Sequence, residues 1–218
     1  IAGWSSSNKY SMFGAIRASA QMISYELSLS LAGVSVVLVG GSLRLTDVVA
    51  QQSNYYFVLF GVLKLPAWNV LSPGMWLSFI VFFVSAFAET NRLPFDFAEA
   101  EAELVAGYHT EYSSMKFALF FMAEYMAMAT MSALITTLYL GGWDIPWYQE
   151  PATFLGFILS FLAFLTKVAI LLFIFVWVRW TIPRLKYDIL MRIGWKFFLP
   201  LAILNIVIVA AFIAGGWL

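Results

Sequence analysis

The stretch ATFLGFILSFLAFLTKVAILLFIFVWV, residues 152–178, carries a single charged side chain, that of Lys167. A run of this length and polarity is long enough to cross a bilayer as one α-helix. Four further apolar runs flank it along the chain, so the predicted spans are about Met12 to Val39, Trp68 to Ala88, Phe117 to Leu140, Ala152 to Val178 and Phe197 to Trp217. Pro73 interrupts the second run, which we expect to form a short or kinked helix.

The composition agrees with a membrane location. Of the 218 residues, 62% are apolar and 11% are charged, whereas about 25% are charged in an ordinary soluble domain. The sequence therefore predicts an all-α fold, a polytopic transmembrane helical bundle of about five spans, with residues 1–218 in a single transmembrane domain. The 12 basic residues balance the 12 acidic ones, and there is no cysteine. Nucleic-acid binding is thus not indicated, and this chain can ligate no iron-sulfur cluster through thiolates.

The placement of the charges predicts an orientation. The connection from Val178 to Phe197 is strongly basic, which is typical of a cytoplasmic loop. The parity of the five spans then also puts the connection from Glu89 to Lys116 on the cytoplasmic side, and the connections Gly40 to Ala67 and Gly141 to Pro151 outside. The segment Tyr55 to Leu65 is apolar enough to lie in the membrane interface.

Three ionisable side chains fall deep inside predicted spans, those of Glu26, Glu124 and Lys167. Each costs roughly 2.5 to 3.5 kcal/mol to insert, so a helix that only had to cross the membrane would carry an apolar residue there. Proton handling is one interpretation. A structural ion pair between Lys167 and either glutamate is the other.

A polar stripe also runs along the first span, because its members recur at helical spacing: Arg17, Gln21, Ser24 and Ser28. The stripe can serve either as hydrogen-bond contacts between helices or as the wall of a water-lined path.

The connection from Glu89 to Lys116 departs from the positive-inside tendency. Its carboxylates are Glu89, Asp96, Glu99, Glu101, Glu103 and Glu111, and they face only Arg92 and Lys116. A capping signal at Asp96, followed by alternating Ala and Glu, predicts a short helix over Ala98 to Ala106. Composition alone favours a solvated acidic helix. His109 is the only histidine, and we expect no role for it and no metal site.

Three motifs are recognisable in order. They are GWSSSNKYSMFGAIRASAQMISYE at residues 3–26, AETNRLPFDFAEAEAELVAGYHTEY at 88–112 and RWTIPRLKYDILMRIGWKFFLP at 179–200. Together they resemble the H-subunit family of NADH-quinone oxidoreductase, the respiratory complex I, whose mitochondrial counterpart is chain 1. The resemblance covers all five spans, but an N-terminal part of the family's chain, with the quinone entrance, is missing.

The resemblance implies that the acidic connection faces the peripheral arm of the complex and lines the quinone chamber, which reverses the solvated interpretation. The chamber residues it implies are Glu89, Arg92, Asp96, Glu99, Glu101 and Glu103. The residues it implies for a proton path are Glu26 and Glu124, with Arg17 and Lys167 as charge partners. No catalytic centre lies within this chain alone.

The same resemblance implies the cofactors, partners and location. Quinone is the substrate, while FMN and the iron-sulfur clusters are held by partner subunits. The expected partners are the quinone-module subunits of the peripheral arm, the small membrane subunits beside the antiporter-like ones, and membrane lipids. The expected location is a bacterial inner membrane rather than a mitochondrial one.

Three other interpretations are weighed beside this one. Membrane subunits of formate hydrogenlyase and energy-converting hydrogenases share a similar acidic loop, but the full AETNRLPFD and SSNKY motifs argue against them. A secondary ion antiporter is expected to show paired half-repeats, and none is visible. A passive membrane anchor would not need Glu26, Glu124 and Lys167 at depth.

Overall fold

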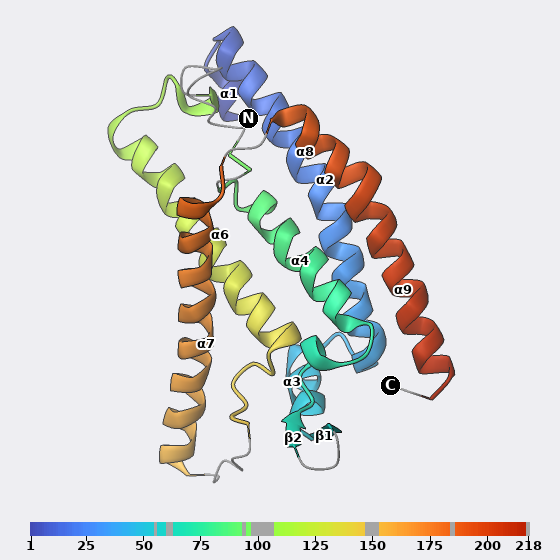
Figure 1. Ribbon diagram of the computed structural model, residues 1–218. Coiled ribbons are helices and arrows are strands. Elements are labelled where there is room, and N and C mark those ends of the chain that lie inside the picture. Colours follow the sequence, from blue (N-terminus) through green and yellow to red (C-terminus); the bar gives the residue numbers. More distant parts are fainter. Residues whose placement is uncertain are drawn as a thin grey trace.

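The computed structural model describes residues 1–54, 56–59, 63–92, 95–96, 107–146, 153–183 and 186–216. Helices dominate this part of the chain (Figure 1). In chain order the elements are α1 (Ala2–Ser5), α2 (Lys9–Gly40), α3 (Leu45–Asn54), β1 (Tyr56–Leu59), β2 (Leu63–Pro66), η1 (Asn69–Leu71), α4 (Met75–Glu89), η2 (Gly107–His109), α6 (Ser114–Tyr139), α7 (Phe154–Thr181), α8 (Tyr187–Ile193), the π-helical η3 (Gly194–Phe198) and α9 (Leu199–Ala214).

The predicted bundle of apolar helices is confirmed. Among the described residues, four helices are long and apolar enough to cross a membrane: Lys9–Gly40, Ser114–Tyr139, Phe154–Thr181 and Tyr187–Ala214. The second predicted span is a shorter apolar helix, α4, which has 15 residues. It begins only at Met75, because the chain before it turns through Gly74 at a φ of 80° after Pro73.

One predicted boundary is wrong by about ten residues. The last span does not begin at Phe197, because α8, η3 and α9 form one helical run from Tyr187. The π-helical turn ends two residues before Pro200, which has no backbone N–H for the regular ladder, so the helix widens there instead of ending. The basic connection is therefore short and carries part of its charge on the first turns of this helix. The segment expected in the interface holds a small antiparallel hairpin, with Tyr56 opposite Pro66.

Helix α2 lies at the centre of the packing, beside α4 on one side and α9 on the other (Figure 1). Buried hydroxyls join the helices: Ser28 Oγ lies 3.0 Å from Ser85 Oγ, and Ser78 Oγ donates to the carbonyl of Ala32 at 2.8 Å. Helices in lipid associate through such close packing and hydrogen bonds. The polar stripe of α2 therefore makes contacts between helices at Gln21, Ser24 and Ser28, which are all buried.

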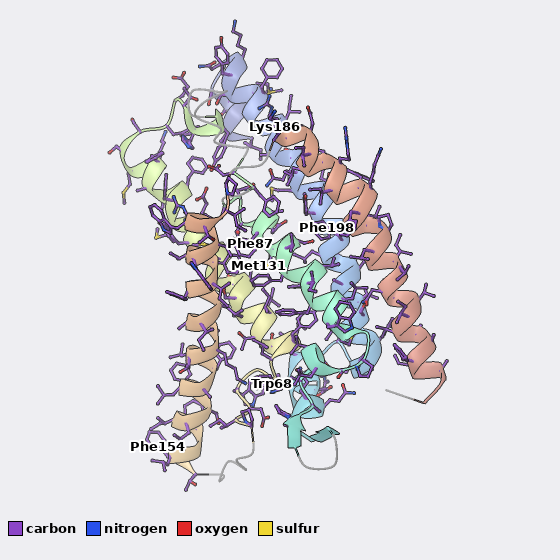
Figure 2. The ribbon with its side chains drawn as sticks, in the orientation of Figure 1. Trp68, Phe87, Met131, Phe154, Lys186 and Phe198 are labelled. Carbon is purple, nitrogen blue, oxygen red and sulfur yellow. The ribbon has the colours of Figure 1, made fainter. Side chains whose placement is uncertain are left out.

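Helix α7 stands at the edge of the bundle, against α6 (Figure 1). Of the 18 consecutive residues that form its most apolar stretch, only 6% are buried within the described chain. In the C-terminal half of α7 an aromatic stack ties it to α4, since the ring centroids of Phe87 and Phe175 lie 4.1 Å apart. Figure 2 shows Phe87 between these two helices. The rest of α7 presents large apolar side chains such as Phe157 and Phe173 to its surroundings.

Candidate functional site

The polar cluster of interest lies where α4 ends. The segment that follows α4 is held against α2 by one fully buried side chain, that of Gln21. Its amide nitrogen donates to the carbonyls of Ala88 and Phe95 at 2.9 and 2.8 Å and lies 3.3 Å from Asn91 Oδ1. Asn91 turns the chain at a φ of 48°, in the left-handed region that asparagine tolerates. Gln21 thus fixes the start of the acidic connection.

Arg92 enters the bundle from this segment. Only 5% of the residue is exposed, and its Nη2 lies 3.7 Å from Oε2 of Glu124 on α6. The guanidinium also lies over the ring of Tyr125, 4.4 Å from the ring centroid. A buried cation needs both a counter-charge and polarisable contacts, and Arg92 finds them on adjacent residues of one helix.

Several buried polar atoms of the cluster have no hydrogen-bond partner among the described residues. They include Glu89 Oε2 and the Nε and Nη2 atoms of Arg92. Such atoms are rare in proteins and are usually satisfied by water or by a bound polar group. The cluster is therefore suited to contact water or the polar head of a ligand.

Glu26 of α2 interacts electrostatically with Glu89, so two carboxylates from different helices face the same region. The side chain of Glu26 is exposed on the surface of the described bundle. Asp96 lies one residue beyond Phe95, whose ring packs 5.8 Å from that of Tyr25 on α2. The structure thus gathers Glu26, Glu89, Arg92 and Glu124 around the C-terminal end of α4.

Two further predicted site residues, Arg17 and Lys167, lie away from this cluster. The guanidinium of Arg17 lies 5.4 Å from the ring of Tyr187, at the start of α8. Lys167 donates to backbone carbonyls just beyond the end of α6. Since Glu124 lies 16 residues before Leu140, about 24 Å along a helix, an ion pair between Lys167 and Glu124 is ruled out. Among the described residues, Glu124 pairs with Arg92. Glu99, Glu101 and Glu103, with the helix expected at Ala98 to Ala106, lie outside the described residues.

Sequence reasoning missed two contributors to the cluster. Tyr125 directly follows Glu124, but one aromatic residue among many gives no signal of its own in the sequence. Gln21 was noted only as part of a stripe, and nothing in the sequence could pair it with a segment 67 to 74 residues away. In the described part of the chain no group of three or more potential ligands could hold a metal ion.

The comparisons with known proteins agree on one group. A family model described as NADH dehydrogenase matches residues 1–210. The chain is 50% identical over 204 residues to the NADH-quinone oxidoreductase H subunit of Leptospira biflexa, a match that covers 92% of this chain and 53% of that protein. It is 49% identical over 218 residues to the corresponding H subunit of Burkholderia vietnamiensis, covering 100% and 58%. It is 45% identical over 223 residues to NADH-quinone oxidoreductase subunit 8 of Rhodothermus marinus, covering 98% and 62%. The chain thus spans a little over half the length of these relatives.

Proposed function

This chain belongs to the NADH dehydrogenase family, and from that premise we propose that it acts as a membrane subunit of a proton-translocating NADH-quinone oxidoreductase. In this role it forms part of the quinone chamber and couples quinone reduction to proton movement through buried carboxylates. Electrons arrive from FMN and iron-sulfur clusters in partner subunits of the peripheral arm. The relatives of similar sequence carry the name of this oxidoreductase in their own names, which supports the proposal.

The observation that carries the proposal is the buried pair of Arg92 and Glu124 beside Glu89. A bundle that only anchored other subunits would gain more from apolar side chains here, because a buried ion pair contributes little net stability. Arg92 Nε and Glu89 Oε2 supply a donor and an acceptor without partners in the described structure. These are the groups that a quinone headgroup, or the water around it, could contact.

Reduction of a quinone takes up electrons and protons, so the charge in the chamber changes during each turnover. A carboxylate cluster near the chamber can respond to that change by binding or releasing a proton. We propose that the response passes from Glu89 to Glu26 and Glu124, with Arg92 as the fixed counter-charge and with Arg17 at the same end of α2. Asp96, Glu99, Glu101 and Glu103 extend the chamber along the acidic connection, on the cytoplasmic side of a bacterial inner membrane.

The assembly is tested first. Membranes of the source organism are solubilised in mild detergent and run on a native gel that is stained for NADH dehydrogenase activity, and the chain is located by peptide mass spectrometry. We expect the chain in a large NADH-active, quinone-reducing band. Its presence instead with a hydrogenase would favour the membrane subunit of an energy-converting hydrogenase, and migration alone would contradict both.

The chamber is tested by charge-neutral variants in the assembled enzyme. We expect Glu99→Gln and Glu101→Gln to lower quinone reduction, proton translocation or both, because they remove negative charge without changing shape. Glu111→Gln is the matched control, since Glu111 is exposed at the far end of the same connection and accepts a hydrogen bond from Asn8. Full activity and full pumping in both test variants would exclude the proposed role of the acidic connection.

A further inference from the structure

The side chain of Lys167 reaches from the middle of α7 to the end of α6 and donates to three backbone carbonyls there. Its Nζ lies 2.8 Å from the oxygen of Leu140, 3.0 Å from that of Gly142 and 2.7 Å from that of Asp144. An ammonium has three N–H donors, one for each of these carbonyls. The indole ring of Trp68 lies on another side, 4.9 Å from Nζ to the ring centroid, and Figure 2 shows Trp68 near this end of the bundle.

These carbonyls converge for reasons that do not depend on Lys167. The chain leaves α6 through Gly141 and Gly142, both with positive φ, at 71° and 53°. A Cβ at Gly141 would lie 2.7 Å from Trp68 Nε1, and one at Gly142 would lie 2.7 Å from a methyl carbon of Val49. The turn is therefore tightly packed from outside, and only glycine fits at either position.

Other polar groups of the turn have partners of their own. Gly142 N donates to the carbonyl of Thr136, and Gly141 N donates to the side-chain oxygen of Gln52. The amide nitrogen of Asn69 donates to the carbonyl of Leu138. A helix leaves its last carbonyls without partners, and in a membrane each must find one. Lys167 supplies three donors to the carbonyls beyond this end.

We propose that the carbonyls of Leu140, Gly142 and Asp144 form a binding site for a monovalent cation, and that Lys167 occupies this site as a tethered ammonium. The ligand class is a primary ammonium or an alkali cation of similar size, because the carbonyl oxygens are neutral and lie 2.7 to 3.0 Å from the ammonium nitrogen. The negative end of the α6 dipole and the Trp68 ring add to the attraction. Lys167 is then a positioning residue that fixes α7 against α6, and not a carrier of protons.

This placement has a consequence at the other end of α7. Arg179 lies 12 residues beyond Lys167, about 18 Å along the helix, and it interacts with Tyr125, the residue whose ring contacts Arg92. Together with the stack of Phe175 on Phe87, the Lys167 contact holds α7 in its position along α6. A slip of α7 would move Arg179 away from the cluster around Glu124.

The experiment uses the full-length protein in its assembled membrane complex. Lys167→Ala removes the ammonium and leaves room at the carbonyls, so we expect heat inactivation to become about tenfold faster. Methylammonium chloride should restore most of the loss, whereas tetramethylammonium chloride at equal ionic strength should not, because it has no N–H to donate. Lys167→Met should lose as much stability and gain nothing from methylammonium, since its side chain fills the space. Thr166→Ala is the control, because Thr166 is exposed and donates only within α7.

Equal rescue by both cations, or unchanged stability of Lys167→Ala, would overturn the proposal. If Lys167→Ala fails to assemble, Lys167→Arg decides the question, because a guanidinium keeps a fixed positive charge and does not release its proton. We expect Lys167→Arg to retain proton translocation, a readout that rests on the proposed function, unlike the stability measurements. Loss of translocation in a Lys167→Arg complex of normal stability would make Lys167 a proton carrier.

Discussion

Arg92 and Glu124 form a contact between the segment after α4 and the N-terminal half of α6, with 3.7 Å between Arg92 Nη2 and Glu124 Oε2. The two side chains are exposed by only 6% and 13%. The ring of Tyr125, the next residue along α6, lies over the same guanidinium. The pair therefore couples the position of the acidic connection to the helix that carries Glu124 and Tyr125.

We expect Arg92→Met to destabilise the protein more than the double variant Arg92→Met/Glu124→Leu. The single change removes the positive charge that Arg92 places beside the Glu124 carboxylate, and breaking a pair with so little exposed surface costs roughly 3 to 5 kcal/mol. The double change removes both charges and should recover most of that loss. Thermal denaturation of the assembled complex measures the difference, with Lys116→Met, an exposed charge, as the control. Quinone reduction should be lost in both variants if the pair contributes to the chamber. Equal destabilisation by the single and double changes would contradict the coupling.

The depth of the charges could be predicted from the sequence, but their partners could not. Hydropathy placed Glu124 and Lys167 well inside long apolar runs, and both runs are helices. Counting along α7 alone put Lys167 at mid-depth, yet its long side chain reaches the end of a neighbouring helix. Which helix ends lie beside which residues depends on tilt and packing, and a single sequence contains no direct record of either.

The boundary of the last span was wrong for a related reason. A run of basic residues predicts a loop, but Arg192 and Lys196 lie on a helix, where long basic side chains can still reach the membrane surface. Pro200 lies at the start of α9, and the π-helical turn before it lets the helical run from Tyr187 continue through it. In contrast, Pro73 did mark the beginning of a short helix, because the residue after it is Gly74 in a left-handed conformation.

Gln21→Leu should loosen the segment from Ala88 to Asp96. The change removes the donor to the carbonyls of Ala88 and Phe95 and leaves them buried, at a cost of roughly 1 to 3 kcal/mol. Hydrogen–deuterium exchange over residues 88–96 should rise, while exchange in α9 stays unchanged. Ser19→Ala is the control on the same helix, since Ser19 donates only to the carbonyl of Ala15. Unchanged exchange in Gln21→Leu would show that other contacts hold the segment.

Gln52→Met should weaken the turn that follows α6 and, with it, the carbonyl site of Lys167. Only 2% of Gln52 is exposed, and its side chain donates to the carbonyl of Thr137 and accepts from the backbone N–H groups of Asn69 and Gly141. Met fills the same space but offers no comparable hydrogen bonds. We expect a lower denaturation temperature and faster exchange at residues 137–144. Ser53→Ala, which removes a donor only to Ala50 within α3, should change neither.

Two glycines of α2 provide the sharpest test of the packing, because the same substitution should have opposite effects on stability. A Cβ at Gly14 would lie 2.9 Å from the backbone nitrogen of Tyr108 and 3.0 Å from the carbonyl carbon of Gly107, so Gly14→Ala must push η2 away. Backbone atoms cannot yield as a side chain can, and overpacking of this kind costs about 1 to 3 kcal/mol.

At Gly33 the nearest atom to an added Cβ is a ring carbon of Phe82, at 3.9 Å, which is ordinary contact. Gly33→Ala should therefore stabilise α2 by roughly 0.5 to 1 kcal/mol through its higher helix propensity. Thermal denaturation of the two variants in the assembled complex makes the comparison. A fall for Gly33→Ala as large as that for Gly14→Ala would mean that α2 lies closer to α4 than described, whereas a neutral Gly14→Ala would mean that η2 does not rest on α2.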